Sequence, residues 1–96
     1  MLYLIFEKRF NSYEWKNFPQ KRKYFLRSIF KSDLILGKPA AEVEQILGRS
    51  ESRSQMKNRW TYVIGTDIKV RKKYFLAVYF ENGIVITVKK EFKIMI

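Results

Sequence analysis

The side chains that could carry out acid–base or metal chemistry are few and scattered in this 96-residue chain. The chain has no histidine and no cysteine, so the commonest general base near neutral pH and every thiolate metal ligand are missing. The nine acidic residues are spread along the sequence, and the four glycines form no phosphate-binding loop. We therefore expect a protein that is not an enzyme and that holds no cofactor or metal.

Asp33 is the one acidic residue in an unusual predicted position, because it falls on the apolar side of a predicted helix. A buried carboxyl group has a raised pKa and can be functional. We favour the structural interpretation, in which Asp33 accepts backbone hydrogen bonds or pairs with an arginine such as Arg22.

Two basic triplets, each followed directly by two aromatic residues, are the candidate binding motifs. Lys21-Arg22-Lys23 precedes Tyr24-Phe25, and Arg71-Lys72-Lys73 precedes Tyr74-Phe75, with Lys69 nearby. Cations neutralise phosphates and exposed rings stack on bases, so these motifs could bind a polyanion. The aromatic residues also fit the periodicity of a core, and we favour burial for them. The candidate polyanion or partner contacts are Lys21, Arg22, Lys23, Lys69, Arg71, Lys72 and Lys73.

The formal net charge is +11, and it is unevenly distributed. Residues 1–32 carry eight basic and two acidic side chains, and residues 51–96 carry ten and four, whereas residues 33–50 are nearly balanced. A balance of this kind attracts nucleic acid, anionic lipid or an acidic protein, or it serves only solubility. A basic helix over 21–31 could also lie on a membrane, but its apolar face is needed to cover a sheet.

The N-terminus does not have the pattern of an export signal. The apolar run Met1–Phe6 is short, and its cations Lys8 and Arg9 follow it instead of preceding it. No window approaches the roughly 18 apolar residues of a membrane span. As written, the sequence predicts a cytoplasmic protein, and the alternative is the mature fragment of an exported envelope protein.

The first half of the chain predicts helices. A single helical turn over 12–17 has Asn11 or Ser12 as its cap. A longer amphipathic helix is expected from 20 to about 36, with Pro19 at its start and Gly37 at its end. A short helix follows over about 39–47 and ends at Gly48. Residues 1–10 are expected to form an arm or extra strand, and residues 11–96 a single domain.

The second half predicts an antiparallel meander. Residues 49–58 read as a mobile polar connection, and apolar residues then define strands over 60–64, 74–80 and 84–88, with an alternating tail. Asn82-Gly83 indicates a type I′ hairpin turn, and 65–73 is expected to be a long loop. The fold class is therefore α+β, with two N-terminal helices packed on a three- or four-stranded antiparallel sheet. The expected core is Leu26, Ile29, Leu34, Val43, Ile46, Leu47, Trp60, Tyr62, Leu76, Val78, Ile84 and Ile86.

Several short motifs in this order resemble a known family. They are Gly37 with Glu42-Val43 and Ile46-Leu47-Gly48, then Trp60-x-Tyr62, Leu76-x-Val78-x-Phe80 and Asn82-Gly83-x-Val85. This series resembles the SmpA/OmlA (BamE-like) family, whose α+β architecture is also that of the β-lactamase inhibitor protein. The run from Trp15 through Pro19, Arg22 and Asp33 to Gly37 is similar to small uncharacterised bacterial relatives of that family.

The resemblance implies a protein that acts by contact, since family members with known roles are assembly subunits or enzyme inhibitors. It transfers no functional residue. The chain departs from the family at Pro39, where a serine or threonine usually caps the second helix, and it lacks the lipoprotein cysteine of exported members. We expect a non-catalytic interaction module with a protein partner, and the alternative is nucleic-acid binding through the basic patches. The sequence sets neither the identity of the partner nor the oligomeric state.

Overall fold

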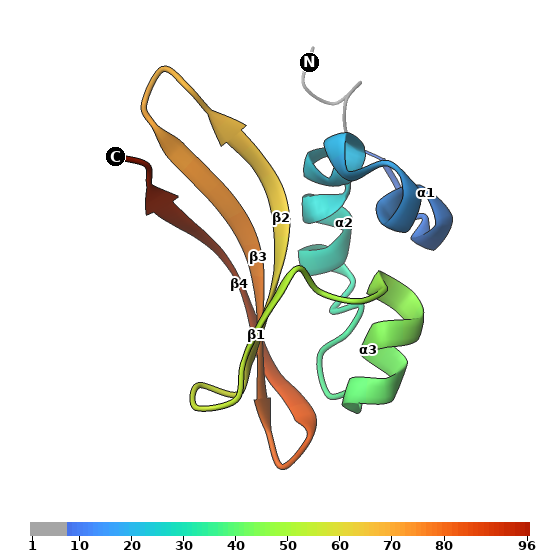
Figure 1. Cartoon of the computed structure of the whole chain (residues 1–96). Coiled ribbons are helices and arrows are strands. Elements are labelled where there is room, and N and C mark those ends of the chain that lie inside the picture. Colours follow the sequence, from blue (N-terminus) through green and yellow to red (C-terminus); the bar gives the residue numbers. More distant parts are fainter. Residues whose placement is uncertain (1–7) are drawn as a thin grey trace.

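The computed structural model describes residues 8–96 and shows a two-layer α+β fold, as predicted. All the helices lie on one side of a curved antiparallel sheet, and none of the described helices covers the other side (Figure 1). Within residues 8–96 the helical elements come first and four strands follow. The strands lie in the spatial order β1 (Ser52–Ser54), β2 (Arg59–Asp67), β3 (Lys72–Glu81) and β4 (Ile84–Ile94). Residues 1–7, which hold most of the predicted arm, lie outside the described residues.

The first helical element, α1 (Ser12–Asn17), has the predicted cap at Asn11. The Glu14 backbone N–H donates to Asn11 Oδ1 at 2.9 Å, which satisfies one of the free donors at the helix start. The helix presents a single buried side chain, Trp15, to the core. Phe10 precedes it and packs its ring 6.0 Å from that of Trp15.

The long helix predicted over 20–36 is wrong in extent and in type. Residues Pro19–Phe25 form a 3₁₀ helix, η2, and only Leu26–Lys31 is α-helical, as α2. In a 3₁₀ helix, side chains three apart lie above one another, and this places Arg22 and Phe25 together in the interior. Asp33, at φ +49°, adopts the left-handed conformation just after the helix end.

Gly37 does not end a helix, which corrects a second expectation. It lies at φ +79° in the connection after α2, where its N–H donates to Val85 O at 2.9 Å. Val85 returns a bond from its own N–H to Lys38 O at 3.0 Å, and Pro39 bridges to Ile84. The segment therefore borders the start of β4. The next helix, α3 (Ala40–Leu47), runs as predicted and ends at Gly48, at φ +78°.

The sheet is an antiparallel meander of β1 (Ser52–Ser54), β2 (Arg59–Asp67), β3 (Lys72–Glu81) and β4 (Ile84–Ile94). The presence of β1 corrects the prediction that 49–58 is only a mobile connection. The strands are longer than predicted, so the expected loop over 65–73 shrinks to residues 68–71. The turn at Asn82-Gly83 has the two positive φ values, +52° and +77°, that the sequence predicted.

The core prediction is confirmed at most positions. Leu26, Ile29, Val43, Leu47, Tyr62, Leu76 and Val78 are buried, and Leu34, Ile46 and Trp60 pack against them partly exposed. The prediction of burial is wrong for Ile84 and Ile86, because both are exposed and the residue between them, Val85, is buried. The register between β3 and β4 shifts near Tyr79 and Phe80, and this irregularity reverses the alternation that the pattern assumed. The expected core also omitted Trp15, Ile35, Ile64, Ala77 and Phe80, whereas the burial favoured for Phe25, after the first basic triplet, is confirmed.

Candidate interaction surfaces

The predicted contact residues lie in two separate places. Lys21, Arg22 and Lys23 belong to η2, whereas Lys69 and Arg71 lie in the turn between β2 and β3. Lys72 and Lys73 begin β3, and successive strand residues point to opposite faces. The second triplet is therefore divided between the turn and the two faces of the sheet.

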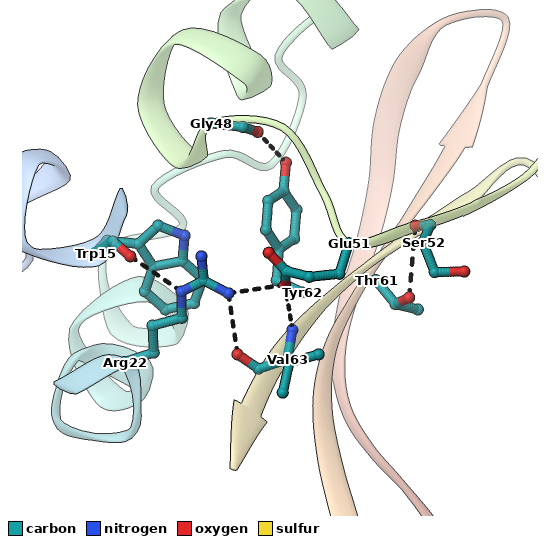
Figure 2. Close-up of polar contacts among 8 residues, drawn as sticks. All are labelled: Trp15, Arg22, Gly48, Glu51, Ser52, Thr61, Tyr62 and Val63. Carbon is teal, nitrogen blue, oxygen red and sulfur yellow. Dashed lines mark hydrogen bonds and ion pairs between the residues drawn. The ribbon is translucent and has the colours of Figure 1, made fainter. Parts of the chain in front are cut away.

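Arg22 is the exception among these residues, because its side chain is only 4% exposed. Its Nε donates to Trp15 O at 3.0 Å, and its Nη1 donates to Val63 O at 3.0 Å and to Glu51 Oε1 at 2.8 Å, as Figure 2 shows. The guanidinium also lies 5.0 Å from the centroid of the Trp15 ring. Arg22 therefore joins η2, α1 and β2 from the inside and is not available on the surface.

Glu51, whose side chain is 42% exposed, and the buried Tyr62 extend this network (Figure 2). The Glu51 carboxylate also accepts the Val63 N–H at 2.7 Å, so it satisfies the backbone of β2 and neutralises Arg22. The Tyr62 hydroxyl donates to Gly48 O at 2.8 Å, which secures the end of α3. Burial raises the pKa of the Tyr62 phenol well above its usual range. These contacts hold the helices against the sheet.

The proposed pairing of Asp33 with Arg22 is wrong, since Arg22 pairs with Glu51. Asp33 is exposed, and its backbone C=O accepts the Leu36 N–H at 3.3 Å in the turn after α2. Aspartate tolerates the left-handed conformation better than most residues, which accounts for its presence here.

The uncovered face of the sheet is the first candidate surface. Residues paired across the strands share a face, so Arg59, Tyr79 and Thr87 form one row on the side opposite Tyr62 and Leu76. Ala77 and Phe75 follow in the next rows of the same face, and Lys73 lies at its far end. We call this surface the open face. Its lysines are Lys73, Lys89 and Lys93.

A polar cluster occupies the middle of the open face. Arg59 Nη1 lies 3.4 Å from Glu91 Oε1, and the Tyr79 hydroxyl donates to the other Glu91 oxygen. These long side chains reach across Ala77, which is fully buried although it lies on this face. The hydrogen bond to Glu91, followed by partial burial, raises the pKa of Tyr79. The Arg59 Nε is buried and has no hydrogen-bond partner among residues 8–96.

The second candidate surface is a groove on the helical side, between η2 and the far ends of the strands. Its volume is about 390 Å³. Its walls include Lys23 and Leu26 from η2 and α2, the β2 segment from Ile64 to Asp67, and Tyr74 and Lys90 from β3 and β4. We call it the η2 groove. It brings Lys23, from the first basic triplet, close to Tyr74, which follows the second.

Lysines lie over aromatic rings beside this groove. The Lys90 ammonium is 4.9 Å from the Tyr74 ring centroid, and Lys72 is 4.2 Å from that of Phe92. Tyr74 and Phe92 are themselves paired across the strands, with centroids 6.3 Å apart. Phe92 is 54% exposed, which core packing does not require. Cation–π contacts of this kind hold the lysines near the rings.

Sequence reasoning missed Arg59, Tyr79 and Glu91 on the open face, Lys90 in the wall of the η2 groove, and Phe92, whose ring lies beside that of the wall residue Tyr74. The tail of β4 carried a usable signal, because Lys89, Glu91 and Lys93 alternate with Lys90 and Phe92. Strand alternation puts these two sets on opposite faces. The alternation does not indicate which of the two faces the helices cover.

Comparison with models of known protein families and with curated proteins found no match to this chain. The resemblance to the SmpA/OmlA family therefore stays a prediction. Within residues 8–96, no helix has the length and apolar character needed to cross a membrane. Over the same residues, no three acidic side chains come together as metal ligands would.

Proposed function

We propose that this domain is a non-catalytic protein-binding module and that the open face is its binding surface. The observation that carries the proposal is the group of Arg59, Phe75 and Tyr79 on a sheet face that none of the described helices covers. Tyrosine and arginine dominate the energy of protein interfaces when they lie at the centre of a patch. Here they are held in place by Glu91 before any partner binds.

The chemistry of the face supports an acidic partner. Lys73, Lys89 and Lys93 surround the central cluster, and the chain as a whole carries +11. Charges at the rim steer association and select against basic partners more than they add affinity. Two copies of this chain repel each other for the same reason, so we propose a different, acidic protein as the partner. The resemblance to the SmpA/OmlA family supports the same role, since its characterised members act by contact.

Site-specific photocrosslinking from the open face tests this proposal. A photoreactive phenylalanine analogue at Phe75 is expected to capture a defined acidic protein, because Phe75 lies inside the proposed interface. The same analogue at Met56, which is 98% exposed in the turn before β2, is the matched control and is expected to capture nothing specific.

The captured protein is then purified and its affinity measured against Arg59→Ala and Lys57→Ala variants. We expect Arg59→Ala to weaken binding by about tenfold or more, as for a central interface residue, and Lys57→Ala to have little effect. Equal capture from both positions, or equal affinity of the two variants, would show that the open face is not the interface. A measured enzymatic turnover would contradict the non-catalytic role.

A further inference from the structure

We propose that the η2 groove is a binding site for single-stranded nucleic acid, a second function on the opposite face from the one assigned to protein binding. Phe92 and Tyr74 would stack on unpaired bases, and Lys23, Lys72 and Lys90 would contact the phosphates. The site joins the two basic motifs, which are about fifty residues apart in sequence, through the packing of η2 on β2.

The first step in support is the composition of the site. Binders of single-stranded nucleic acid combine a positively charged groove with aromatic rings on which successive bases stack. The η2 groove has Lys23 on one wall and Lys90 beside Tyr74 on the other. Its volume of about 390 Å³ lies in the range of pockets that hold small organic groups, roughly 300–1,000 Å³.

The second step is the exposure of Phe92. Exposure of a phenylalanine ring to water is thermodynamically unfavourable. Neither core packing nor a helix cap explains the exposure of Phe92. It lies next to Tyr74 at 6.3 Å, so the two rings offer neighbouring stacking surfaces. Lys72 already lies over the Phe92 ring, and it can move to a phosphate when a base takes its place.

The third step is charge. Of the seven basic side chains in residues 67–73 and 89–96, Lys72 and Lys90 lie on the groove side, Lys69 and Arg71 lie in the adjoining turn, and the other three lie on the open face. Of the two acidic side chains, Glu91 lies on the open face with Arg59 and Tyr79, and Asp67, which accepts the Lys69 N–H at 3.0 Å, is the one carboxylate among the described residues of the groove wall, where Lys23, Lys72 and Lys90 outnumber it. The field around the groove is therefore positive, and it favours a ligand with one negative charge per residue. Paired bases cannot stack on these rings, so a single strand is preferred over a duplex.

Fluorescence anisotropy with a labelled oligothymidylate of about 12 nucleotides, within the usual site sizes of such domains, tests the site. The titration is done at about 50 and about 200 mM NaCl, where phosphate contacts weaken steeply. We expect binding at both salt concentrations and weaker binding of the corresponding duplex. No binding at about 200 mM, or preference for the duplex, would overturn the proposal.

Matched variants separate the groove from net charge. Lys90 lies in the wall of the groove, and Lys90→Glu reverses its charge. Lys57→Glu makes the same charge change in the remote turn before β2. We expect the groove variant to weaken binding by about tenfold more than the control and to reduce the salt dependence. Equal losses would show that only net charge matters and would overturn the site.

Phe92 tests stacking directly. Phe92→Leu keeps an apolar side chain and is expected to weaken binding about fivefold or more, whereas Phe92→Tyr keeps the ring and the affinity. Circular dichroism and thermal unfolding verify that each variant folds.

Polyglutamate is a competitor of similar charge without bases. If it competes as well as the oligonucleotide and Phe92→Leu changes nothing, the groove binds acidic peptides instead. Arg59→Ala, on the open face, is expected to leave this binding unchanged, so the two proposals can fail separately.

Discussion

At the scale of single residues, the most consequential side chain is Arg22. The sequence placed it in a basic triplet between two lysines, yet it is buried among three oxygen acceptors. A buried guanidinium is tolerable only when its donors are paired, and here one carboxylate and two backbone carbonyls pair them. Within one basic triplet, Arg22 therefore has a structural role, whereas the neighbouring Lys23 is exposed on the surface.

Replacing Arg22 with methionine is expected to lower the free energy of unfolding by about 2–4 kcal/mol, because two buried carbonyl groups lose their donor. Arg22→Lys is expected to lose most of the same energy, since one ammonium group cannot reproduce the fork of a guanidinium. Urea unfolding measures both. Lys23→Met is the matched control, and as an exposed change it should stay within about 0.5 kcal/mol. A similar loss in the control would contradict the buried role.

Tyr62 gives a prediction for alkaline pH. Burial raises its pKa in the folded state above the value of about 10 in the unfolded chain. The folded protein therefore keeps the phenol proton where the unfolded chain loses it. The stability from protonated Tyr62 is complete below about pH 10 and falls as the pH rises from there towards the folded-state pKa, by at most about 1.4 kcal/mol per pH unit.

Tyr62→Phe isolates this effect, because all other titrating groups are common to both proteins. Near pH 8 the variant is expected to be less stable by about 1 kcal/mol, since Gly48 O loses its donor. Above about pH 10 the difference should shrink, because only the wild type loses stability through this group. Urea unfolding at several pH values measures it. A difference that stays constant up to about pH 11 would mean that Tyr62 titrates normally.

At the scale of elements, β4 is correctly predicted as a strand, but a register shift makes the prediction of its buried residues wrong. The residues that alternate in the sequence, Ile84, Ile86 and Val88, do not share a face, because the pairing slips by one residue opposite Tyr79 and Phe80. A slip of one residue moves a side chain to the other face. Val85 is consequently buried, at 2% exposure, and Ile86 is 52% exposed.

A pair of alanine variants checks this register. Val85→Ala removes two buried methyl groups and is expected to cost about 2 kcal/mol of unfolding free energy. Ile86→Ala removes more carbon atoms but from an exposed position, so we expect less than about 1 kcal/mol. Chemical denaturation of both variants gives the comparison. The reverse order would restore the simple alternation that the sequence suggests.

In the helical layer, some helix ends are predicted correctly from local sequence, whereas the 3₁₀ geometry of η2 is not. Asn11, Pro19 and Gly48 mark helix ends or starts where the sequence put them, since each acts through local geometry. The 3₁₀ geometry of η2 is not local in origin. It accompanies the burial of Arg22 and Phe25 on one side, next to partners from α1 and β2.

At the scale of the whole molecule, charge is the dominant property. A net charge of +11 on 96 residues makes the folded state repel itself. The exposed cation–π and ion-pair contacts, such as Arg53 with Glu44 and with the Trp60 ring, offset only part of this. The hydrogen bond from Arg53 lowers the pKa of Glu44 and keeps that carboxylate charged.

Added salt is therefore expected to stabilise the protein. Raising NaCl from about 0.01 to about 0.1 M shortens the screening length from about 30 to about 10 Å, which weakens long-range repulsion more than the contact pairs. Thermal unfolding at fixed pH should show a higher midpoint. Lys57→Glu, which lowers the net charge, is expected to show a smaller increase. A falling midpoint would mean that attractive pairs outweigh the repulsion.

The sequence by itself determined the α+β class, the short helix ending at Gly48, the Asn82-Gly83 hairpin and most of the core, including Leu76 and Val78. These features follow from periodicity and from backbone preferences that act within a few residues. The tertiary structure alone decided that Arg22 is buried, that the register slips beside Val85, and that Lys23 meets Tyr74 and Lys90 in one groove. Each of these depends on contacts between segments far apart in the chain, and such contacts leave no local pattern.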